Sequence, residues 1–254
     1  TSSIGSYFFV MKILQYINGR TILVITIALI SCYWSLRFDF KLHFDVVLFG
    51  LAIAFPLATS IQTAFKRREK ALEYLSLFRA GMIAIHYSLQ GEEKLVPAAK
   101  EDAKKILNKV TDQLFTQLRE SNGDMKQFQE AFDDVMKFVQ SNREFISGRI
   151  VVRIIRYLKE AVNGATFLLS LIEHRTMAGL RFYSLSFIHV YAVLQAPMMV
   201  YEFNNQLSDW AIYFAAAFSS LILITLFNFQ RLIEFPFDQK GADDIDLDDF
   251  KLNL

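Results

Sequence analysis

The sequence predicts an all-α membrane protein with four transmembrane helices per subunit and a cytosolic helical bundle. Three observations predict this class. Hydrophobic residues make up 53% of the 254 residues and charged residues only 21%, whereas soluble domains carry about 25% charge. The charges are nearly absent from four windows and dense between the second and third. No stretch alternates apolar and polar residues with period two, so helices are expected throughout.

Each of the four windows is long enough, or nearly so, to cross a bilayer. The first holds 16 residues between Arg20 and Arg37 and reaches roughly 24 Å at 1.5 Å per residue, short of a core of about 30 Å. Snorkelling arginines and the apolar stretch from Ile13 extend it. The expected spans are residues 21–36, 46–65, 182–201 and 210–230.

Basic residues near the span ends predict the orientation. Most of them fall on one side of the membrane. The opposite side has only two basic residues, Arg37 and Lys41 in the first short loop, and no basic residue between positions 202 and 209. Both termini and the large insert are therefore expected in the cytosol, or on the equivalent side of an organelle. The cytosolic side collects Lys12, Arg20, Lys66, Arg67, Arg68, Lys70, Arg175, Arg181, Arg231 and Lys240.

The insert is expected to form a helical bundle. Apolar residues recur at three and four along residues 103–118, 128–139 and 150–162, which is the pattern of amphipathic helices. Pro97 suits a first helical turn, and residues 121–124 read as a stop followed by a capped restart. The predicted division is 1–65 with the first two spans, 66–175 as the cytosolic region, 176–234 with spans three and four, and 235–254 as an acidic tail.

Composition and motifs exclude several functions. A net charge of +1 provides no strong electrostatic attraction for nucleic acid. With only one Cys, the chain forms no intrachain disulfide. Nucleophile elbows, phosphate-binding glycine loops and zinc-protease motifs are absent from the sequence, and the four histidines are scattered. We therefore expect no enzyme. A soluble α-protein with four buried helices is a poorer alternative because of the uncharged windows and the one-sided basic residues. A secondary transporter is poorer because the spans show no convincing internal symmetry.

The second span contains the most informative pattern. Leu51, Phe55 and Thr59 are spaced i, i+4, i+8 and share one helical face. In a ring of such helices, Leu51 and Phe55 would form apolar constrictions that gate by dewetting, and Thr59 a hydroxyl ring. Ordinary helix packing explains the same stripe, and the pattern alone leaves both interpretations open. Pro56 removes an amide donor and frees the carbonyl of Ala52.

Lys66, Arg67 and Arg68 follow this span directly. They anchor a span end on the cytosolic side, or they form a basic inner collar that concentrates anions.

Three stretches resemble the bestrophin family in its prokaryotic-like form. LAIAFPLATSIQTAFKRREKALEY is similar to the family's neck helix and its cytosolic continuation. IEHRTMAGLRFYSLSFIHVYAVLQAP is similar to the segment E-R-I-x-x-T-P-x-P-F-x-Y-x-x-x-x-H-R. IEFPFDQKGADDIDLDDF is similar to an E-N-P-F-G tail followed by N-D-L-P-L-D. The matching positions are Glu173, Arg175, Thr176, Tyr183, His189, Glu234, Pro236, Phe237, Asp244, Ile245, Leu247 and Asp248.

The resemblance implies a homopentamer with one ion pathway on its axis, in a lipid bilayer and open to small inorganic ions. It places the pore neck at Leu51, Phe55 and Thr59. Thr59 stands where the family has an aromatic residue, which implies a wider or wetter neck. The resemblance leaves the ion's sign open, and the basic collar favours chloride or other small anions.

The acidic tail departs from the calcium clasp of animal members. Residues 239–242, Ile245 and Leu247 interrupt it, and calcium needs six to eight converging oxygens. No cofactor is therefore expected, and calcium is a weak alternative through Asp243, Asp244, Asp246 and Asp248.

The sequence thus predicts a multi-pass channel of the cell membrane, or of an organelle membrane, that passes anions passively. The alternatives are a cation-selective bestrophin homologue and a non-conducting membrane scaffold.

Overall fold

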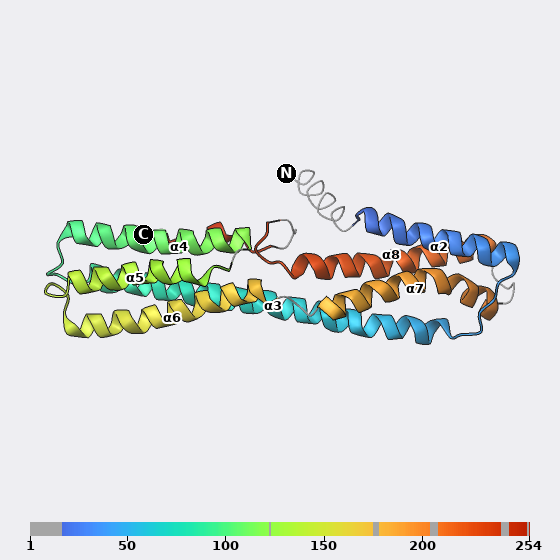
Figure 1. Ribbon diagram of the computed structural model, residues 1–254, viewed down its shortest axis with the longest axis horizontal. Coiled ribbons are helices and arrows are strands. Elements are labelled where there is room, and N and C mark those ends of the chain that lie inside the picture. The colour runs from blue at the N-terminus through green and yellow to red at the C-terminus, as the bar shows by residue number, and fades with distance from the viewer. Residues whose placement is uncertain (1–16, 122, 175–177, 204–207, 240–243, 253) are drawn as a thin grey trace, which may run out of the picture. The chain divides into compact units, whose positions relative to one another are not determined.

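A computed structural model describes residues 17–121, 123–174, 178–203, 208–239, 244–252 and 254, except the side chains of Val46 and Ala178. All regular elements in these ranges are helices (Figure 1). Lys12, Ile13, Arg175, Thr176, Lys240 and Asp243, which carry expectations from the sequence, lie outside them. The elements are α2 (Gly19–Phe38), α3 (Val46–Gln90), α4 (Pro97–Glu120), α5 (Met125–Ser141), α6 (Gly148–Glu173), α7 (Ala178–Phe203), α8 (Asp209–Ile233) and the 3₁₀ turn η1 (Leu247–Phe250).

Four helices are long and apolar enough to cross a membrane, which makes the chain an integral membrane protein. This confirms the four spans expected from the sequence. The second is longer than its apolar window, because α3 continues through the charged residues after Phe65. The candidate spans are Gly19–Phe38, Val47–Gln90, Gly179–Phe203 and Asp209–Ile233.

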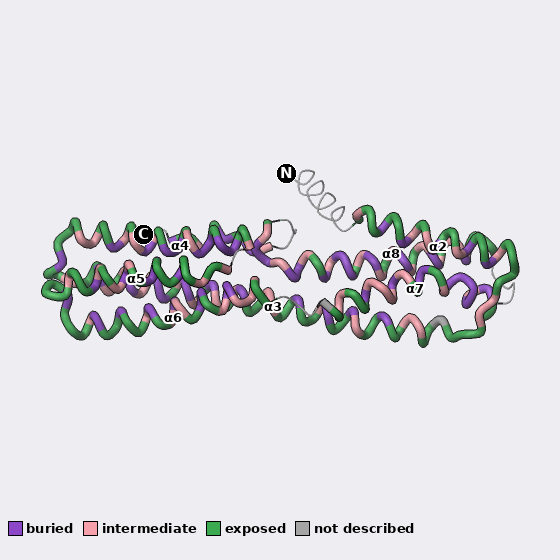
Figure 2. Tube along the Cα trace, in the orientation of Figure 1, coloured by how far each residue is buried: buried purple, intermediate pink, exposed green. Residues whose placement is uncertain are grey.

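The chain packs as two compact units. The first contains Thr1–Phe65 and Thr176–Glu234, and the second contains Lys66–Arg175 and Phe235–Leu254. Helix α3 contributes residues to both units. In each unit, buried positions recur along the helices between exposed ones (Figure 2), as amphipathic packing requires.

In the first unit, α2 packs against α7 and α8, and α7 packs against α8 (Figure 1). Residues of α3 join the same core. Small and branched side chains allow this close packing, as is usual between transmembrane helices. The fully buried members of the largest cluster include Val24, Ala28, Ile53, Leu57, Ile188, Ala192 and Ile224.

Hydrogen bonds satisfy several of the polar groups that this unit buries. Pro197 lies inside α7 and has no amide hydrogen, so the carbonyl of Val193 lacks its helical donor. The hydroxyl of Ser31 on α2 donates to that carbonyl and joins the two helices. Gln195, fully buried, donates to the carbonyl of Ala216 at 3.0 Å and to the hydroxyl of Ser220 at 2.6 Å on α8.

The second unit is built from the remainder of α3 with α4, α5, α6 and the tail. Its helix ends confirm two expectations. Pro97 is the first residue of α4, and Asp124 caps α5 by accepting hydrogen bonds from the amides of Lys126 and Gln127. One expectation is wrong: Ile155, which lies on the apolar stripe expected along residues 150–162 of α6, is 47% exposed.

Helices α3 and α6 approach each other closely at two glycines. A Cβ on Gly81 would lie 2.9 Å from the carbonyl oxygen of Tyr157, and one on Gly164 would lie 2.7 Å from that of Tyr74. These distances are shorter than a side chain tolerates, so both positions need glycine for packing. The rings of Tyr74 and Phe167 stack beside them, with centroids 3.8 Å apart.

Candidate functional site

The residues expected to form the neck, Leu51, Phe55 and Thr59, lie on the face of α3 that the first unit leaves uncovered. Leu51 is 46% exposed, Phe55 is 67% exposed, and Thr59 is exposed as well. On the opposite face Ile53 and Leu57 are each 1% exposed and belong to the core. The helix therefore presents this face, which we call the neck face after the role expected of it, away from the core of the first unit.

Aromatic contacts fix the rotation of α3. The ring of Phe49 stacks on Tyr191 of α7 with centroids 6.0 Å apart, and Phe65 meets Phe229 of α8 at 5.8 Å. Next to Phe49, an added Cβ at Gly50 would lie in ordinary van der Waals contact with the Tyr191 ring, at 3.9 Å. With these points held, Leu51 and Phe55 cannot turn inward without breaking the core.

Thr59 bonds to its own helix. Its hydroxyl donates to the carbonyl of Pro56 at 2.9 Å, and the Thr63 hydroxyl donates to the carbonyl of Thr59 at 2.8 Å. Such local bonds satisfy a hydroxyl in an apolar setting. The oxygen of Thr59 keeps acceptor capacity, so the position is polar but its donor is already used.

Comparison with known proteins yields structural matches only. No protein-family model matches the chain, and no curated protein sequence does. A point mutant of a bacterial bestrophin homologue from Klebsiella pneumoniae matches with a TM-score of 0.75 and 16% identity, covering 95% of this chain and 94% of that one. A second structure of that homologue, solved by Zn-SAD phasing, matches with a TM-score of 0.74 and 15% identity, and covers 95% of this chain and 94% of that one.

The chain has the bestrophin fold. A TM-score of 0.75 over nearly the full length of both chains decides it. A third match, a crystal structure described only as that of a mutated membrane protein, has the same score and 16% identity. These matches confirm the resemblance that the three sequence stretches predicted.

Within the bestrophin fold, the three basic residues of α3 that follow the expected second span do not behave alike. Lys66 is exposed. Arg67 donates to the carbonyls of His174 at 3.0 Å and Leu171 at 2.7 Å, at the C-terminal end of α6. Cations favour this end of a helix because its last carbonyls carry partial negative charge. Arg68 is half-buried. The sequence predicted three equivalent charges, whereas in the structure Arg67 caps the C-terminal end of α6.

The tail packs on the second unit through its apolar residues. Phe237, Ile245 and Leu247 are all at most 3% exposed and belong to the core with α4. The amide of Ile245 donates to the carbonyl of Pro236 at 2.8 Å. Ile245 and Leu247, two of the residues that interrupt the acidic run, therefore anchor the tail.

The candidate calcium residues that the structure describes do not gather. Asp246 caps η1 by accepting from the amide of Asp248 at 2.9 Å, Asp244 is half-buried, and Asp243 lies outside the described residues. Asp248 contacts Arg119 at 2.7 Å and Lys251 at 2.9 Å. In the part of the chain that is described, no three acidic, cysteine or histidine side chains lie close enough to hold a metal ion.

Acid is expected to loosen the tail. Hydrogen bonds from Lys251 and Arg119 lower the pKa of Asp248. A lowered carboxyl pKa stabilises the folded state above the unfolded value of about 3.9, and this contribution is lost as the pH falls through the folded pKa. Hydrogen-exchange protection of residues 244–252, corrected for intrinsic rates, should therefore fall below about pH 4. Asp248→Asn should lower it already at pH 7. Equal protection of the variant and the wild type at pH 7 contradicts the prediction.

Proposed function

We propose that the chain is a bestrophin-like channel: a homopentamer in which the neck residues of five α3 helices surround one ion pathway. Ions pass it down their electrochemical gradient. One observation carries the proposal: on a bestrophin fold, the side chains of Leu51 and Phe55 are apolar, exposed and held outward by the packing of α3.

A groove beside the neck face supports assembly through α3. It lies between α3 and α8, has a volume of about 380 Å³ and is lined by Leu57, Ala58, Ile61, Gln62, Phe65 and Leu226. Small residues such as Ala58 let helices approach closely. A neighbouring copy that packs here leaves Leu51 and Phe55 to the axis.

The second unit is proposed to lie in the cytosol. Its surface carries far more charge than the spans, and the basic residues near the span ends favour the cytosolic side for both termini. The proposed location is the cell membrane, with an organelle membrane as the alternative.

We propose that the channel conducts anions. One observation favours cations as the second candidate. Lys66 and the other basic residues after the neck attract anions. Glu69 and Glu73 are exposed on α3 in the same unit, however. Lys70 contacts Glu73 at 2.6 Å and neutralises it in part, which leaves Lys66 and Glu69 as the opposing charges.

Reversal potentials test conduction and ion sign together. Purified protein in planar bilayers under a tenfold KCl gradient should reverse close to the chloride equilibrium potential, about 59 mV from zero for full selectivity. Reversal near the potassium potential selects the cation channel. Absence of current at every voltage, with a pentamer intact by size-exclusion chromatography, selects the non-conducting scaffold and overturns the proposal.

A further inference from the structure

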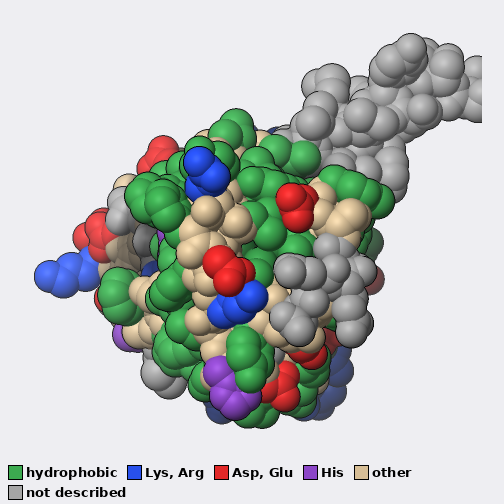
Figure 3. Space-filling model, turned by 90° about the vertical axis from the view of Figure 1, so that its right-hand side faces the viewer, with side chains coloured by type: hydrophobic (Ala, Val, Ile, Leu, Met, Phe, Trp, Pro, Cys, Tyr) green, Lys and Arg blue, Asp and Glu red, His purple; other side chains and the backbone are tan. Residues whose placement is uncertain are grey.

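A pocket opens at the end of the first unit that carries the loop between α2 and α3. Figure 3 looks onto this end, where a few charged and histidine side chains stand among hydrophobic ones. The pocket has a volume of about 540 Å³. We call it the loop pocket; its lining residues are Lys41, His43, Phe44, Asp45, Tyr201 and Glu202.

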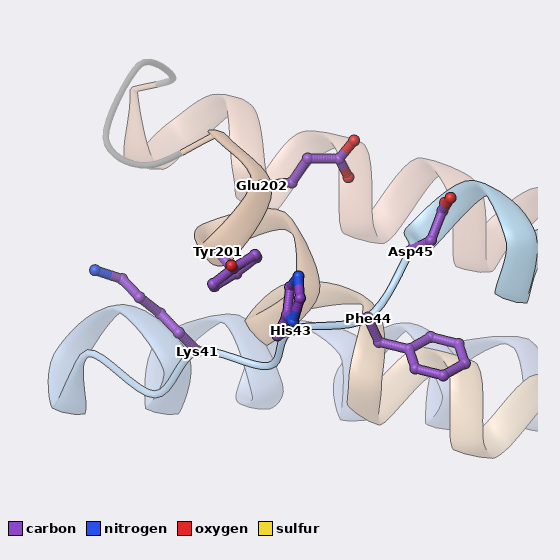
Figure 4. Close-up of a pocket in the computed structure, with 6 residues that line it drawn as sticks. All are labelled: Lys41, His43, Phe44, Asp45, Tyr201 and Glu202. Atoms are coloured by element: carbon purple, nitrogen blue, oxygen red, sulfur yellow. The ribbon is translucent and has the colours of Figure 1, made fainter.

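Two segments far apart in the sequence build the loop pocket. The amide of Leu42 donates to the carbonyl of Pro197 at 3.1 Å, which ties the loop to α7. The rings of His43 and Tyr201 then lie in contact, with centroids 4.6 Å apart. Figure 4 shows these two rings side by side, with the carboxylates of Glu202 and Asp45 on one side of the pair.

Two carboxylates and one lysine line the pocket, and the lysine is paired with a carboxylate outside the lining. Lys41 extends away from the ring pair (Figure 4) and contacts the carboxylate of Asp39 at 2.9 Å, which offsets its charge in part. Asp45 uses one oxygen to cap α3, accepting from the amides of Val47 and Leu48 at 2.8 and 3.0 Å. Glu202 has no ion-pair partner among the residues that the structure describes. Carboxylates beside an aromatic ring are the surroundings that a cation prefers.

The described side chains favour an organic cation over a metal ion. Metal ions need ligand oxygens that converge within about 2.6 Å of one point, and no described group of acidic and histidine side chains does so. An organic ammonium ion is larger. Its N–H groups can donate to two separate carboxylates, and its carbon atoms can contact aromatic rings.

We propose that the loop pocket binds a primary organic ammonium ion, with Glu202 and Asp45 accepting its hydrogen bonds and the Tyr201 ring covering its apolar part. The ammonium belongs to a free amine or to the headgroup of an ethanolamine lipid, because the pocket lies where the α7 span ends. Binding does not depend on conduction.

Titration of purified protein in detergent with ethylammonium tests the site. Saturable binding is expected, and Glu202→Gln and Tyr201→Leu should each weaken it by about tenfold. The matched controls remove the same groups outside the pocket: Asp209→Asn and Tyr33→Leu should stay within about twofold of the wild type. Non-saturable heats, or variants that bind like the wild type while the controls do too, overturn the proposal.

Native mass spectrometry separates the two sources of the ammonium. Phosphatidylethanolamine that co-purifies with the wild type and is lost from Glu202→Gln assigns the pocket to the lipid headgroup. Equal lipid retention, together with saturable ethylammonium binding, assigns it to a free amine. Both measurements are made without ion flux, so a chain that fails to conduct can still pass this test, and a conducting channel can fail it.

Discussion

Phe55→Ala is expected to raise the single-channel conductance or the leak by about tenfold, which corresponds to a barrier lowered by about 1.4 kcal/mol. The phenyl group is 67% exposed on the neck face of α3, so it contributes little to the core of its own subunit. In the proposed ring of five the phenyl group would narrow the pathway and repel water, and an apolar constriction of this kind opposes ion entry. Alanine at the same place widens and wets the neck.

Phe214→Ala is the matched control. Phe214 lies on α8 of the same unit and is 62% exposed, but it is outside the neck face. Its removal should leave the current unchanged in planar bilayers. Equal currents in wild type, Phe55→Ala and Phe214→Ala, with all three pentameric, would contradict the prediction. They would show that the neck face contacts lipid or another helix and does not line a pore.

Gly164→Leu is expected to destabilise the second unit by about 3 kcal/mol, because overpacking forces neighbouring atoms out of place. A Cβ at this position already lies 2.7 Å from the carbonyl oxygen of Tyr74 and 3.0 Å from the amide nitrogen of Phe78. These are backbone atoms of α3, which cannot move aside as a flexible side chain can. The midpoint of thermal unfolding should fall by roughly 6–12 °C for a chain of this length.

Gly148→Leu provides the control for this substitution. Gly148 is the first residue of the same helix, and nothing lies within 4 Å of an added Cβ. Its thermal midpoint, measured by light scattering or intrinsic fluorescence, should match the wild type. A Gly164→Leu protein that unfolds at the wild-type temperature would show that α3 and α6 are not packed this closely.

The spans and helix ends were predictable because their causes are local. An uncharged window favours a membrane helix whatever surrounds it, and Pro97 and Asp124 act through their own backbone geometry and side chains. Ile155 was not predictable from its stripe. Helical periodicity identifies a face, but the width of the face that becomes buried depends on how far the neighbouring helices extend across it.

The candidate sites divide in the same way. Helical spacing put Leu51, Phe55 and Thr59 on one face. The role of Arg67 could not be inferred, since its partner carbonyls at Leu171 and His174 are more than 100 positions away. The loop pocket was missed for this reason, because His43 and Tyr201 meet only when α7 lies against the loop.

The sequence by itself determined an all-helical membrane protein, its four spans and the shared face of the neck residues, since hydropathy and helical period act over one or a few turns. Only the tertiary structure decided which way that face points. The rotation of α3 is set by Phe49 against Tyr191 and Phe65 against Phe229, contacts between residues distant in the chain whose energies appear only once the helices pack.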